Sequence, residues 1–110
     1  MDFVAYHMDL VREITSKVSN HNGLSYLFGA HIFTLYLLGF GLDEKLFASV
    51  LDNAPLKIGK RLYGTNLNTQ SPKCLAGQKN ALVILKAGVY NDEIKNDILH
   101  NINSSVEFYE

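Results

Sequence analysis

The side chains best suited to chemistry lie in one loop, which follows an apolar segment at residues 47–51. The loop begins with an acid and an amide and continues with three cations. In chain order these residues are Asp52, Asn53, Lys57, Lys60 and Arg61. Ammonium and guanidinium groups form charge-assisted hydrogen bonds with phosphate oxygens, so the loop is suited to holding a diphosphate. A solvated loop that folds over the edge of a sheet has the same composition, and this alternative stays open.

A second candidate segment is the turn Gly29-Ala30-His31, which follows a short apolar run. Dinucleotide-binding folds place a glycine-rich fingerprint at this position, because glycines let the backbone approach a pyrophosphate at a helix N-terminus. Only the first glycine is present here, so a tight grip on a dinucleotide is not expected. His31 could face a phosphate, or it could be a local cap. Asp52 follows Gly29 by 23 residues, close to the position of the ribose-binding acid of such folds, although Asp also commonly starts turns.

Groupings typical of catalysis or metal binding are missing from the sequence pattern. The four histidines lie in separate predicted elements, and Cys74 is the single cysteine. A lone cysteine in an apolar short helix is expected to pack rather than react. The residues by themselves therefore indicate neither a nucleophile nor a metal site.

Composition limits the class of protein. A chain of 110 residues with 47% hydrophobic and 19% charged residues is expected to form one globular domain. A net charge of −1 argues against a nucleic-acid binder that relies on bulk electrostatics. The longest apolar stretch, residues 30–42, is too short to span a bilayer, and the first ten residues do not resemble a signal peptide. We expect a cytoplasmic domain that binds neither nucleic acid nor membrane.

Apolar periodicity predicts alternating helices and strands. Helices are expected at 3–19, 31–41 and 91–103, with a short one at 71–77, and strands at 24–28, 45–51, 81–85 and 105–109. Tyr6 and Tyr36 lie on apolar helix faces and are expected in the core. Uninterrupted apolar strands between helices indicate a parallel sheet that is covered on both faces.

The predicted fold class is α/β, a small three-layer Rossmann-like sandwich with a mainly parallel sheet of four or five strands. Residues 24–28, 47–51 and 81–85 are expected to be adjacent central strands. We assign residues 1–22 to an N-terminal linker-type helix that packs on the domain, and 23–110 to the Rossmann-like domain. Ligands of such sheets bind beyond the carboxyl ends of the strands, where both candidate segments lie.

The stretch from Ser25 to Pro72 resembles a known family. Its features are "FGA" before a buried helix, the pattern "DNAPLKIGKRLYGT" at residues 52–65, and a following Ser-Pro. These features are similar to the C-terminal domain of S-adenosylmethionine-dependent nucleotide-sugar C-methyltransferases. The helix at residues 2–20 also resembles the helix that joins that domain to the methyltransferase core.

The resemblance implies a domain that helps to enclose a nucleotide-sugar and is inactive alone. It places the S-adenosylmethionine cofactor and the catalytic residues in preceding domains, so no cofactor is expected in this chain. It implies a methyltransferase core domain as a partner, in cis or in trans. The nucleotide-sugar contacts would come from Gly29, Ala30, His31 and the five loop residues named above. The alternatives are a non-catalytic structural or interaction module of the same fold, and a small regulatory domain that binds another nucleotide or an acyl carrier.

Overall fold

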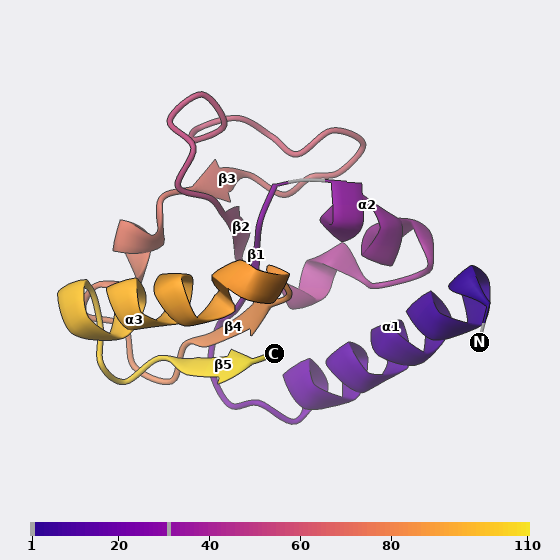
Figure 1. Cartoon of the computed structure of the whole chain (residues 1–110), viewed down its shortest axis with the longest axis horizontal. Coiled ribbons are helices and arrows are strands. Elements are labelled where there is room, and N and C mark those ends of the chain that lie inside the picture. Colours follow the sequence, from indigo (N-terminus) through magenta and orange to yellow (C-terminus); the bar gives the residue numbers. More distant parts are fainter. Residues whose placement is uncertain (1, 31) are drawn as a thin grey trace.

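Five strands form the centre of the molecule, and helices cover both faces of the sheet (Figure 1). The computed structural model describes residues 2–30 and 32–110. The helices and strands are α1 (Phe3–Ser19), β1 (Ser25–Phe28), α2 (Ile32–Gly39), β2 (Ser49–Leu51), β3 (Thr69–Gln70), β4 (Leu82–Leu85), α3 (Asn91–Asn101) and β5 (Glu107–Tyr109). Three short 3-10 helices connect them, namely η1 (Glu44–Leu46), η2 (Pro72–Leu75) and η3 (Gly88–Tyr90).

The strand order is β3-β2-β1-β4-β5, and every neighbouring pair is parallel. Leu27 in β1 lies opposite Val50 of β2 on one side and Ile84 of β4 on the other. The chain first builds outward from β1 to β3 and then returns to start β4 on the other side of β1. The point where the direction reverses, between β1 and β4, is where doubly wound sheets bind their ligands. The predicted fold class and the three adjacent central strands are confirmed.

Alternate side chains of the strands feed two separate cores, one on each face of the sheet. Leu27, Val50 and Ile84 join the buried residues of α1 and α2 in the first core. Phe28 and Leu85 join α3 and η2 in the second core. Because both faces are covered, β1 and β4 are buried at every position, which explains their continuous apolar sequence.

Helix α1 begins at its predicted N-cap, but only part of its predicted apolar stripe is buried, since Phe3, Val4 and Met8 are 54%, 51% and 45% exposed. The Asp2 carboxylate accepts a hydrogen bond from the Ala5 N–H at 2.8 Å, which is a standard N-cap contact. The buried residues recur at helical spacing and face the first core. They are His7, Leu10, Val11, Ile14 and Val18. The helix therefore shares a core with the sheet.

The return from β3 to β4 is unusually short, because its only helical segment is η2, of four residues. The Ser71 hydroxyl caps η2 by accepting from the Lys73 N–H, and Pro72 occupies its first turn, as predicted. Asn103 holds the following turn in place, since its amide donates to the carbonyls of Leu75 and Gln78 at 2.8 and 2.7 Å. On the face of the sheet that α3 covers, the place beside α3 is therefore covered by the single helical turn η2.

Three sequence expectations need correction. The strand predicted at 45–51 begins only at Ser49, because the Asp43 carboxylate caps a 3-10 turn at Glu44–Leu46. β3 was not predicted, since two residues without an apolar run carry no periodic signal. Tyr6 and Tyr36 are not core residues, with 49% and 41% of their surface exposed.

Among the described residues, no helix has the length and apolarity that crossing a bilayer requires.

Candidate functional site

The turn after β1 is held by backbone hydrogen bonds that depend on Gly29. Its φ of +104° is a conformation that favours glycine, and its N–H donates to the Leu51 carbonyl at 2.7 Å. The Thr34 hydroxyl donates to the Gly29 carbonyl at 2.6 Å. The glycine is therefore explained by the tight strand-to-helix turn, without a ligand.

Asp52, at the end of β2, uses both carboxylate oxygens on its own chain. One oxygen accepts from the Ala54 N–H at 2.8 Å and starts a turn, and the other accepts from the Ala30 N–H at 2.9 Å. The carboxylate thus ties the turn after β1 to the end of β2. A ribose would have to share these oxygens with the two backbone groups.

Lys57 supports the same turn from the other side. Its ammonium donates to the Ala30 carbonyl at 2.9 Å and lies 3.9 Å from the Asp52 carboxylate. Both polar groups of the Ala30 backbone therefore have partners within the chain. A phosphate at this edge would depend on side-chain cations rather than on the Ala30 N–H.

The loop between β2 and β3 is partly an irregular hairpin. The Gly59 N–H donates to the Thr69 carbonyl, and the Thr69 N–H donates to the Lys60 carbonyl, both at 2.8 Å. The Leu62 N–H then donates to the Leu67 carbonyl, also at 2.8 Å. This pairing fixes the backbone that carries Lys60, so part of the loop's length is explained by its own structure.

The predicted cations lie around one hollow at the carboxyl edge of the sheet. The hollow has a volume of about 320 Å³, and its wall includes Ala30, Lys57, Lys60 and Arg61. Among the described residues, no hydrogen bond or ion pair engages the side chains of Lys60 and Arg61. Two cations are therefore available to an anionic ligand beside the turn after β1.

Sequence reasoning missed the apolar side of this hollow. Leu56 and Tyr63 are 82% and 88% exposed and help to line it. A second hollow of about 390 Å³ shares Leu35 and Tyr63 with the first and continues along α2 past Leu38. The position of Tyr63 within the basic loop is the sequence signal that could have revealed this apolar side. A ring beside cations suits a ligand that has an aromatic and an anionic part.

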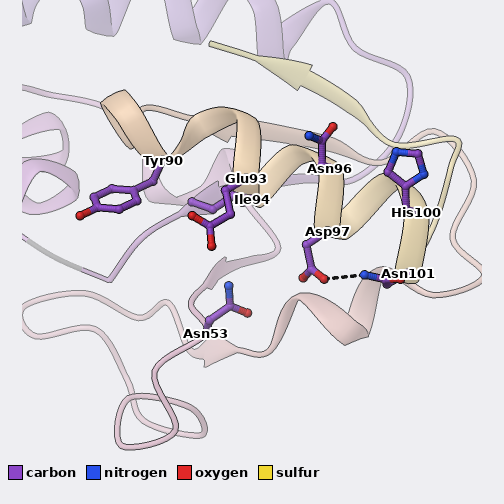
Figure 2. Close-up of a pocket in the computed structure, with 8 residues that line it drawn as sticks. All are labelled: Asn53, Tyr90, Glu93, Ile94, Asn96, Asp97, His100 and Asn101. Carbon is purple, nitrogen blue, oxygen red and sulfur yellow. Dashed lines mark hydrogen bonds between the residues drawn. The ribbon is translucent and has the colours of Figure 1, made fainter.

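Of the eight predicted residues, Ala30, Lys57, Lys60 and Arg61 line the basic hollow, whereas Gly29 and Asp52 lie in the adjoining turns without lining it. Asn53 does not line the basic hollow, and instead faces α3 across a separate groove (Figure 2). His31 lies outside the described residues. Ligand contact by any of the eight predicted residues stays a prediction.

Other reactive groups give no sign of catalysis. Burial raises the pKa of the Cys74 thiol, so the residue is a thiol rather than a thiolate at neutral pH, consistent with packing. Among residues 2–30 and 32–110, no group of three or more His, Cys, Asp or Glu side chains could hold a metal ion.

Comparison with known proteins adds no relative. No family model matches the chain, and neither the curated proteins nor the solved structures contain a match.

Proposed function

We propose that this domain binds a nucleotide-sugar at the carboxyl edge of β1 and β2, as the non-catalytic C-terminal domain of an S-adenosylmethionine-dependent sugar C-methyltransferase. The observation that carries the proposal is the hollow where Lys60 and Arg61, whose side chains have no partner among the described residues, lie beside Ala30. Two cations on a fixed backbone suit a diphosphate, which carries charge on several oxygens.

The apolar side of the hollow suits the nucleoside. The Tyr63 ring is almost fully exposed, and an exposed ring offers a face on which a base can stack. Leu56 and Leu35 complete an apolar wall beside the cations. A ligand with an aromatic base and a diphosphate matches this division of the hollow.

The methyltransferase context comes from the sequence pattern. The loop "DNAPLKIGKRLYGT" that resembles those enzymes contains Lys60 and Arg61. Deprotonation beside a sugar ketone needs a positioned base, and methyl transfer needs a cofactor pocket. In the proposal, both belong to the partner core domain.

An NMR titration of the isolated domain with UDP-glucose and dTDP-glucose tests the proposal. Shifts confined to residues 29–34 and 52–64 are expected at millimolar ligand. Lys60→Ala combined with Arg61→Ala should weaken binding at least tenfold, because each charge-assisted bond contributes about 1.5–3 kcal/mol. Lys79→Ala, which removes an exposed cation just before β4, is the matched control and should bind normally. No shifts, or shifts elsewhere, would contradict nucleotide-sugar binding.

Activity assays test the second half of the proposal. The domain with S-adenosylmethionine and nucleotide-sugars should give no methylated product, and calorimetry should detect no cofactor binding. Turnover by this chain alone would overturn the assignment of catalysis to a partner domain.

A non-catalytic structural or interaction module is the second candidate. It is favoured by the internal contacts of Asp52 and Lys57, which bond to the backbone of their own chain. A titration without any response to nucleotide-sugars would select this candidate.

A further inference from the structure

A groove lined mainly by polar residues runs along α3 on the face of the sheet opposite α2. Tyr90, Glu93, Asp97 and Asn101 succeed one another at helical spacing and form one wall, while Asn53 lies opposite (Figure 2). Figure 2 shows the carboxylates of Glu93 and Asp97 pointing from α3 toward Asn53. The groove has a volume of about 580 Å³, within the range of small-molecule sites.

The groove exists because the connection from β3 to β4 is so short. A doubly wound sheet usually carries a full crossover helix at this place, whereas this chain has only η2. An adjoining hollow of about 350 Å³ shares Asp97 and Asn101 with the groove and extends to Lys73 of η2. The polar wall of α3 therefore lacks the helical neighbour that would otherwise cover it.

Most polar groups of the groove are free to bind a ligand. Asp97 accepts a hydrogen bond from the Asn101 amide at 2.8 Å, which orients both side chains. Among the described residues, no hydrogen bond or ion pair engages the side chains of Asn53, Glu93 or His100. The groove thus presents carboxylate acceptors, amides that donate and accept, and an imidazole, all on α3 except for the Asn53 amide.

This combination of groups discriminates between ligand classes. The carboxylates of Glu93 and Asp97 disfavour anions, and no metal-binding group of three or more ligands is present in the described chain. A simple cation would need acceptors alone, but Asn53 and the Tyr90 hydroxyl also supply donors. A sugar carries vicinal hydroxyls that donate and accept together, and its C–H face can pack on the 62% exposed Tyr90 and on the half-buried Ile94.

We infer that the α3 groove is a binding site for a polyhydroxylated ligand of monosaccharide size. The inference does not rest on the proposed function, because the groove needs neither a phosphate nor the cations of the basic loop, although Asn53 at the start of that loop borders it. Free sugars probe this groove, whereas free UDP probes the basic hollow, so the two ideas can fail separately.

The experiment is an NMR titration of the whole chain with D-glucose, D-galactose, L-rhamnose and myo-inositol, each to 200 mM. At least one should shift residue 53 and residues 90–101 with saturable, millimolar affinity. Raising NaCl to 300 mM should leave that affinity unchanged, since neutral hydroxyls are not screened. No saturable shift with any of the four, shifts outside the groove, or tighter binding of putrescine than of every sugar would overturn the inference.

A double variant tests the residues. Glu93→Ala with Asp97→Ala should weaken the sugar response at least fivefold while circular dichroism shows an intact fold. Asp92→Ala is the matched control, because Asp92 is an acid in the first turn of α3 that does not line the groove. Equal sugar binding by the double variant and the control would refute the role of the two carboxylates.

Discussion

Asp52→Asn separates an architectural role of Asp52 from a ligand-binding one. The carboxylate is largely buried, with 15% of the side chain exposed, and its oxygens accept from the N–H groups of Ala30 and Ala54. The asparagine amide keeps one acceptor and turns a donor toward the other N–H group. One charge-assisted bond is lost and a buried donor is left unpaired.

The expected cost is about 2–3 kcal/mol of unfolding free energy, since bonds to charged groups contribute about 1.5–3 kcal/mol. The ion pair with Lys57 is discounted, because that lysine is half exposed and such pairs add about 0–1 kcal/mol. For a domain of this size the loss corresponds to a Tm lower by roughly 8–15 °C.

Urea denaturation without ligand, followed by circular dichroism, measures this loss. The control is Asp43→Asn, where an exposed carboxylate accepts one bond from the Lys45 N–H; because asparagine caps about as well as aspartate, the cost should stay below about 0.5 kcal/mol. The m-value should not change, because the perturbation is local. If Asp52→Asn costs no more than the control, the two hydrogen bonds do not hold the turn, and the reasoning about Asp52 fails.

Three further substitutions or reactions test the packing. Gly23→Ala should destabilise the domain by about 3 kcal/mol or more, because a Cβ there would lie 2.1 Å from the Asn80 backbone oxygen. Gly39→Ala is the control and should cost nothing, because its Cβ would meet nothing within 4 Å. Equal urea midpoints for the two variants would contradict this contact. Ser49→Ala should raise stability by about 1 kcal/mol, because its buried hydroxyl has no partner among the described residues, and a loss above 1 kcal/mol would refute the assignment. Cys74 should react with a disulfide reagent at least tenfold more slowly in the native than in the urea-unfolded chain at pH 8, because burial raises the thiol pKa and lowers the thiolate fraction. The reaction rate of the native chain should increase as the pH rises. A native rate equal to the rate of the unfolded chain would exclude this protection.

The sequence was sufficient for the fold because the central strands carry an unambiguous signal. Residues 81–85 are apolar at every position, and burial of β4 on both faces is the reason. The strand prediction started too early, at residue 45, because Leu46 and Phe47 form an apolar pair. In the structure Asp43 caps a 3-10 helix at Glu44–Leu46 instead. The two-residue β3 owes its existence to pairing with β2 and has no local signal.

The candidate site was only partly predictable for a different reason. The pattern located the cations, and the parallel topology placed them at the carboxyl edge near Ala30. It could not tell which cation the chain itself uses, because Lys57 and Lys60 look alike in sequence. That distinction depends on the turn after β1, where the Ala30 carbonyl accepts a hydrogen bond from the Lys57 ammonium. The α3 groove was missed because it results from the short connection through η2 rather than from a motif.

The internal use of Asp52 and Lys57 changes how this edge can bind an anion. In a dinucleotide fold, backbone N–H groups at the helix N-terminus hold the pyrophosphate and an acid holds the ribose. Here the Ala30 N–H is bonded to Asp52, so the available positive charge is on the exposed side chains of Lys60 and Arg61. Exposed side-chain charges are screened by salt and lose conformational entropy on binding, so the isolated edge favours weak, salt-sensitive association. A partner surface that covered the hollow would exclude water and strengthen the same contacts. The methyltransferase core domain of the proposed function would be such a partner.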